Sequence, residues 1–129
     1  RTLLVLDGWK NLYPSIELIG IYRHPNAVAK SLEKRSSKSR EESLKLWYAY
    51  NKALFDEYKI NKFSILNFDN DEADLDEKML GAAAEMGLEN KNEEEKFYTA
   101  ELRHNDGAGG PSLPWKVSRL YKKLKKFGR

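Results

Sequence analysis

Arg23 and Ser31 are the residues whose types and spacing most directly suggest chemistry. Arg23 follows an apolar run, residues 16–22, and precedes a helix pattern that opens with Pro25. A strand, a short turn and a proline-led helix make an anion site, because unpaired N–H groups and the positive end of the helix dipole meet there. The guanidinium matches a phosphate, and Ser31, eight residues later, adds a hydroxyl. The pattern is compatible with a phosphate site, but strand-end arginines more often pair with a nearby carboxylate or face water, and both alternatives stay open at this point.

The pattern around Arg23 predicts the elements that hold it in place. Residues 16–22 are apolar and rich in β-branched side chains, which suits a buried strand of a parallel sheet. Helical spacing then covers residues 25–35. Ser39 followed by Glu42 matches a capping box, and the apolar positions behind it predict a long amphipathic helix.

The second half of the chain continues the alternation of strands and helices. Residues 63–68 predict a second strand, and Asp74 with Glu77 predicts the cap of a helix that ends at Gly87. Residues 107–114, rich in glycine and proline, predict a loop. This order predicts an α/β fold with right-handed crossovers and a parallel sheet flanked by helices. The last helix is expected to be strongly basic, with an apolar stripe formed by Val117, Leu120, Tyr121 and Leu124.

The composition limits the class of protein. The chain has 129 residues, 40% hydrophobic and 33% charged, which fits one globular domain. Cysteine is absent, which excludes disulfides and thiolate metal sites and favours a reducing, cytoplasmic setting. No apolar run reaches the roughly 18–20 residues that cross a bilayer. The first residue is Arg1 and apolar residues follow at once, so we expect the chain to be part of a longer protein.

Residues 21–32, Ile-Tyr-Arg-His-Pro-Asn-Ala-Val-Ala-Lys-Ser-Leu, resemble the 3′-phosphate-binding segment of sulfotransferases that use 3′-phosphoadenosine 5′-phosphosulfate. In that family a strand ends in an arginine and a serine follows eight residues later, as Arg23 and Ser31 do here. The resemblance implies that both residues bind the 3′-phosphate of this nucleotide. It also implies a P-loop NTPase-like sulfotransferase fold, incomplete at the N-terminus, with residues 1–129 forming the C-terminal portion of a single domain.

Flanking segments extend the resemblance. Residues 1–14 and 46–51 are similar to the family's helices before and after that strand. Residues 65–69 resemble the strand that in many members ends in tyrosine, glutamate and aspartate. Phe68 replaces the tyrosine, so the resemblance implies an aromatic contact with adenine without the hydroxyl. Arg103, shortly before a glycine-rich loop, matches a late segment that approaches the nucleotide in relatives.

The resemblance also implies a reaction. An acceptor hydroxyl or amine, on a small molecule or a carbohydrate, attacks sulfur in line without a metal or a covalent enzyme intermediate. The family's phosphosulfate loop and usual catalytic base lie upstream of the arginine segment, so no catalytic residue is assigned here. His24 is expected to cap a helix rather than to act as an acid or base. This chain alone is therefore expected to be inactive, and an exposed sheet edge could associate with another copy.

Two other readings of the sequence remain open. A non-enzymatic module could bind a nucleotide, a nucleic acid or an acidic membrane surface through the basic C-terminal helix. The apolar stripe of that helix argues against nucleic-acid binding, because it is typical of a helix docked on its own domain. A different phosphate-handling α/β protein, such as a relative of the nucleotide kinases, is the other alternative, and the spacing of Arg23 and Ser31 favours the sulfotransferase.

Overall fold

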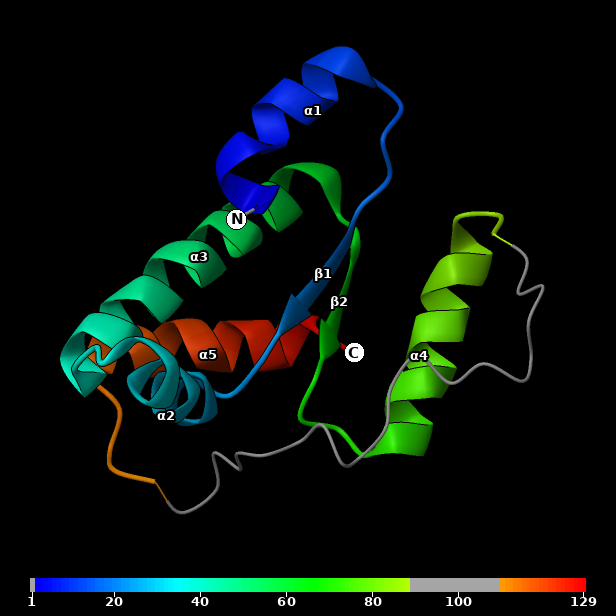
Figure 1. The fold of residues 1–129 in the computed structure, drawn as a ribbon. Coiled ribbons are helices and arrows are strands. Elements are labelled where there is room, and N and C mark those ends of the chain that lie inside the picture. Colours follow the sequence, from blue (N-terminus) through cyan, green and yellow to red (C-terminus); the bar gives the residue numbers. More distant parts are fainter. Residues whose placement is uncertain (1, 89–109) are drawn as a thin grey trace.

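The computed structural model describes residues 2–88 and 110–129. In this part, two strands and five α-helices follow one turn of 3₁₀-helix (Figure 1). Their order is η1 (Thr2–Val5), α1 (Leu6–Leu12), β1 (Ile19–Tyr22), α2 (Pro25–Ser36), α3 (Arg40–Asn61), β2 (Ser64–Asn67), α4 (Glu72–Glu85) and α5 (Trp115–Phe127).

The two strands form a parallel sheet, in which Gly20 lies opposite Ile65. A parallel pair needs a long crossover, and α2 and α3 provide it. Arg129 runs along the other edge of β2: its N–H donates to the Ile65 carbonyl at 2.8 Å, and its carbonyl accepts from the Asn67 N–H at 3.2 Å. The predicted combination of helices with a parallel sheet is thus confirmed.

Helices cover the two faces of the sheet unequally (Figure 1). On one side lie α2, α3 and α5, and on the other lies α4. The smaller core cluster joins Leu66 of β2 to Leu75 of α4. The larger cluster joins β1 and β2 to the three helices on the other side, through Tyr22, Ala29, Leu44, Trp47, Leu54, Phe55, Ile65, Val117, Leu120 and Leu124.

Helices α2 and α3 begin where the sequence predicts. Pro25 is the first residue of α2, where its missing N–H costs nothing. The capping box of α3 is present: the Ser39 side chain accepts from the Glu42 N–H, and the Glu42 carboxylate accepts from the Ser39 N–H. In α5 the predicted apolar stripe is confirmed, because Val117, Leu120 and Leu124 are buried and Tyr121 is half-buried.

The prediction of a buried strand over residues 16–22 was partly wrong. β1 begins only at Ile19, and its side chains alternate between exposed and buried. Ile19 and Ile21 are 39% and 53% exposed. The reason is that α4 packs on β2, while among the described residues no strand pairs with the second edge of β1. The sheet edge expected from the sequence is therefore present in the described part of the chain.

The predicted cap of α4 was also wrong. Asp71 is the N-cap, and its side chain accepts from the Asp74 N–H at 2.9 Å. Asp74 lies inside the first turn and instead pairs with Lys78 at 2.7 Å. The helix ends at Glu85, two residues before Gly87, which adopts the left-handed conformation at φ 71°. Asp71 is the N-cap because it immediately precedes Glu72, the first of the helical residues whose N–H groups lack an acceptor within the helix.

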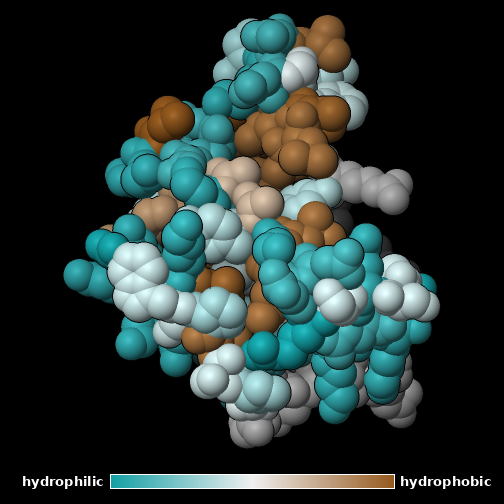
Figure 2. All heavy atoms as spheres, turned by 90° about the vertical axis from the view of Figure 1, so that its left-hand side faces the viewer, coloured by the Kyte–Doolittle hydropathy of each residue, from teal (hydrophilic) through white to brown (hydrophobic). Residues whose placement is uncertain are grey.

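Apolar side chains gather on the surface around the first helix. Figure 2 shows brown hydrophobic residues concentrated in the upper part of the face, at the level of α1. Large hydrophobic residues of η1, of α1 and of the position after α1 are exposed, namely Leu4, Val5, Trp9, Leu12 and Tyr13. Over the described ranges, no helix combines the length and the apolar character that a membrane crossing requires.

Candidate functional site

A cavity of about 360 Å³ opens at the carboxyl end of β1. Its wall is built from the end of β1, one side of α2, one side of α3 and Phe68 just after β2. Most of the lining is apolar or aromatic, including Trp47 and Tyr50 of α3. Among the described lining residues, Arg23 is the only one with a charged side chain. Ligands of open α/β sheets bind at this end of the strands, so the cavity is the natural candidate for a binding site.

Contacts with Asp69, Phe68 and Trp47 hold Arg23 in this cavity. Its Nε donates to Asp69 Oδ1 at 3.1 Å, and both side chains are about four-fifths buried, with exposed fractions of 19% and 23%. Its guanidinium carbon lies 5.2 Å from the centre of the Phe68 ring. Its backbone carbonyl accepts from Trp47 Nε1 at 2.9 Å. Strand, helix and loop therefore all fix the arginine before a ligand arrives. Binding of an anion then costs less conformational entropy of the arginine side chain.

The turn between β1 and α2 is fixed by the same carboxylate. The His24 N–H donates to Asp69 Oδ2 at 2.5 Å, while His24 Nδ1 accepts from the Asn26 N–H at 3.1 Å. The expected capping role of His24 is thus confirmed. The imidazole also lies edge-on to Tyr121 of α5, with ring centres 4.9 Å apart. The N-terminus of α2 is held directly beside Arg23 by these contacts.

The other three predicted site residues, Phe68, Ser31 and Arg103, differ in their relation to the cavity. Phe68 lines the cavity together with Arg23, as its predicted role requires. Ser31 lies in the same helix as two lining residues, Val28 and Leu32, but is not itself part of the wall, and its hydroxyl accepts from Arg35 at 3.3 Å. Arg103 lies outside the described residues.

The sequence did not reveal a group of hydrogen bonds that joins the start of α2 to residues 111–112. A guanidinium nitrogen of Arg40 donates to the Asn26 side chain and to the backbone carbonyls of Pro111 and Ser112, at 3.0–3.3 Å. The Asn26 amide also donates to the Pro111 carbonyl at 2.9 Å. These bonds tie residues 110–112 to the end of α2 that faces the cavity. No local pattern signals them, because the partners lie more than seventy residues apart.

Two phenols, the buried Tyr22 and the half-buried Tyr121, border the Arg23–Asp69 pair. Burial, aided by Tyr121 and Asp69, raises the pKa of Tyr22 to about 12. Burial and Asp69 also raise the pKa of Tyr121 above its ordinary value. Both tyrosines therefore stay neutral at physiological pH, and they add no negative charge that would repel a phosphate.

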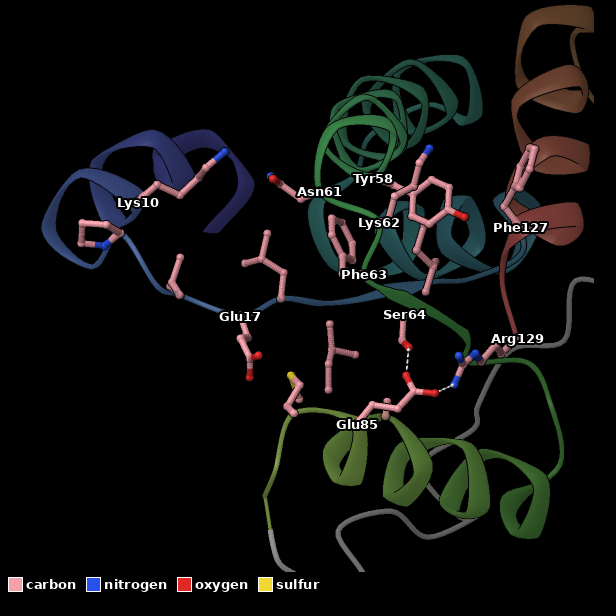
Figure 3. Close-up of a pocket in the computed structure, with 17 residues that line it drawn as sticks. Lys10, Glu17, Tyr58, Asn61, Lys62, Phe63, Ser64, Glu85, Phe127 and Arg129 are labelled. Carbon is pink, nitrogen blue, oxygen red and sulfur yellow. Dashed lines mark hydrogen bonds and ion pairs between the residues drawn. The ribbon is translucent and has the colours of Figure 1, made fainter.

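A second, larger cavity of about 490 Å³ lies at the opposite, amino end of the strands (Figure 3). Glu85 lies between Ser64, at 3.1 Å, and Arg129, at 2.6 Å. Lys10 pairs at 2.7 Å with Glu57, which lies outside the lining. Since this cavity lies away from the carboxyl ends of the strands, where ligands of open α/β sheets bind, we assign the candidate site to the smaller cavity.

The described residues contain no group of three or more histidine, cysteine or acidic side chains placed to hold a metal ion. Comparison with family models, with curated proteins and with solved structures found no match for the chain. The site must therefore be interpreted from its own chemistry: a fixed guanidinium at a helix N-terminus, with an aromatic ring against it.

Proposed function

We propose that this chain supplies the 3′-phosphate-binding part of a sulfotransferase that uses 3′-phosphoadenosine 5′-phosphosulfate. The observation that carries the proposal is the position of Arg23, at the carboxyl end of β1, beside the N-terminus of α2 and inside an apolar cavity. The match of Arg23 and Ser31 to the family's segment supports a sulfotransferase over another phosphate-binding protein.

Each residue has a separate role in this proposal. The Arg23 guanidinium binds the 3′-phosphate by charge-assisted hydrogen bonds. Asp69 accepts a hydrogen bond from Nε of the same guanidinium. Phe68 offers its ring to the adenine, a contact of roughly 1–3 kcal/mol for a base on an aromatic side chain. Ser31 adds a weaker hydroxyl contact from the next turn of α2.

The chemical step needs groups besides these. A bond forms between the acceptor oxygen or nitrogen and sulfur while the bond from sulfur to the bridging oxygen of the donor breaks. In this proposal Arg23, Phe68 and Ser31 fix the nucleotide end of the donor. They neither activate the acceptor, a small molecule or a carbohydrate, nor protonate the leaving group, and no metal takes part.

Calorimetric titration with adenosine 3′,5′-bisphosphate tests the proposal, with adenosine 5′-monophosphate as the matched ligand that lacks the 3′-phosphate. The bisphosphate should bind at least tenfold more tightly, equivalent to about 1.4 kcal/mol. Equal affinity for the two ligands, in protein whose folding is verified by circular dichroism, would contradict it.

A further inference from the structure

The outward face of α5 carries an unusual concentration of positive charge. The helix has six basic residues among its 13 and no acidic one. All six are exposed. They are Lys116, Arg119, Lys122, Lys123, Lys125 and Lys126. From the first to the last, the helix rises about 15 Å, so the charge is dense along its axis.

Packing determines which way this charge points. The opposite stripe of α5, formed by Val117, Leu120 and Leu124, is buried in the larger core cluster. Helical geometry places Arg119, Lys122 and Lys126 on the other side of the helix. The basic face is consequently held toward solvent by the hydrophobic core.

This charge is not neutralised within the described part of the chain. None of the six basic residues forms an ion pair with a described acidic residue. The lysines of α3 differ: Lys45 pairs with Glu41, and Lys59 pairs with Asp56, each at 2.7 Å. An unpaired row of cations raises the local concentration of polyanions and of their counterions.

The exposed aromatic rings of α5 lie at its two ends: Trp115, 68% exposed, is its first residue, and Phe127, 44% exposed, is its last. The Arg119 guanidinium lies 5.2 Å from the centre of the Trp115 ring. Lys123 and Lys59 lie 5.6 Å and 5.9 Å from the Phe55 ring. Proteins that bind single-stranded nucleic acids use open rings on which bases stack. The two exposed rings of α5 are about 18 Å apart along the helix axis, so they form no continuous stacking surface, and this face offers mainly the point charges of lysine.

We propose that the basic face of α5 binds a linear anionic polysaccharide that carries sulfate groups. Flexible lysine side chains can follow sulfates at irregular spacing, without base stacking or groove geometry. Insertion into a membrane is disfavoured, because the apolar stripe that an interfacial helix would bury in lipid is already in the protein core. The surface lies on the side of α5 that faces away from Arg23, since Tyr121 contacts His24 on the inner side. It is thus independent of the proposed nucleotide site.

The test measures binding of a heparin oligosaccharide over a range of salt concentrations. Lys122→Gln, Lys123→Gln and Lys126→Gln together remove three charges from α5. The matched control, Lys30→Gln, Lys34→Gln and Lys38→Gln, removes three exposed charges from α2 and the turn after it. We expect the α5 variant to lose at least tenfold in affinity, and the slope of log K against log salt to fall by about one for each charge removed. The α2 variant should keep both the affinity and the slope within a factor of two.

Two further ligands separate the polysaccharide from other polyanions. A duplex DNA oligonucleotide and vesicles of phosphatidylserine and phosphatidylcholine should bind more weakly than heparin at about 0.15 M salt, where long-range surface attraction is largely screened. Tighter binding of DNA or of vesicles would overturn the proposal, and so would equal losses in the two triple variants. Arg23→Ala should leave heparin binding unchanged even if it abolishes nucleotide binding, which distinguishes failure of this inference from failure of the proposed function.

Discussion

Arg23 and Asp69 are joined at the carboxyl ends of the two strands, with Nε of the arginine 3.1 Å from one carboxylate oxygen. The other oxygen accepts a hydrogen bond from the N–H of His24, the N-cap residue of α2. One carboxylate thus positions both the guanidinium and the helix N-terminus. The same negative charge also opposes an approaching phosphate, so Asp69 should have two measurable effects of opposite sign.

The Asp69→Asn variant separates these effects. The amide oxygen can still accept one N–H bond, but the charge is gone, so repulsion of a phosphate at Arg23 is removed. We expect adenosine 3′,5′-bisphosphate to bind several-fold more tightly. Loss of the charge-assisted bonds should lower the free energy of unfolding by about 1–3 kcal/mol. Titration and urea unfolding measure the two quantities, and weaker binding by a folded variant would show that the positioning role of Asp69 outweighs the repulsion.

The Ser31 hydroxyl is expected to contribute less than Arg23. It is a neutral donor outside the cavity wall, and water can replace it at a partly solvated phosphate. Ser31→Ala should therefore weaken bisphosphate binding by roughly 1 kcal/mol and leave 5′-monophosphate binding unaltered. The matched variant Ser36→Ala, at the far end of α2, should change neither. A loss with both ligands would indicate a structural rather than a phosphate-binding role for Ser31.

The features that the sequence predicted depend on local signals. The start of α2 at Pro25, the capping role of His24 and the capping box of Ser39 each involve residues within three positions of one another. The resemblance implied that Arg23 and Phe68 both contact the nucleotide, and the parallel pairing of β1 with β2 brings them together, because the carboxyl ends of the strands meet at one edge.

The errors arose where local signals were ambiguous or distant contacts decided. Asp71 and Asp74 both match an N-cap pattern, and only the position of the helix start distinguishes them. Pairing of Arg23 with a carboxylate was one interpretation of the sequence, but Asp69 is 46 residues away, and its selection depends on the register of β1 and β2. The sequence did not predict that one face of β1 is exposed. A continuous run of apolar residues does not show whether one face of the strand or both faces are covered.

Alkaline pH should destabilise the fold through Tyr22. Its pKa is about 12 in the folded protein and about 10 in an unfolded chain, so the folded state holds this proton more tightly. The stabilisation is complete below pH ~10 and is lost as the pH rises toward 12, by up to about 1.4 kcal/mol per pH unit. Urea unfolding at several alkaline pH values measures the slope. Tyr22→Phe should flatten it, and an equal slope in that variant would assign the effect to other groups.

Gly20 allows α3 to approach β1 closely. A Cβ at this position would lie 2.8 Å from Leu54 Cδ1 and 3.0 Å from the Phe63 ring. Gly20→Ala should therefore lower the free energy of unfolding by about 1–3 kcal/mol through overpacking. Gly81 of α4 is the matched control, since a Cβ there meets nothing within 4 Å. Gly81→Ala should raise stability by about 0.5–1 kcal/mol, and a loss at Gly81 equal to that at Gly20 would exclude the packing explanation.

The central claim is that Arg23 binds a 3′-phosphate, and a cycle of two ligands and two proteins tests it most directly. Adenosine 3′,5′-bisphosphate and adenosine 5′-monophosphate are titrated into the original protein and into Arg23→Ala, with Arg119→Ala as an exposed-arginine control on α5. The 3′-phosphate should strengthen binding to the original protein and to the control by about 1.5–3 kcal/mol, and Arg23→Ala should lose most of that gain. A preference for the 3′-phosphate that persists unchanged in folded Arg23→Ala would contradict the account.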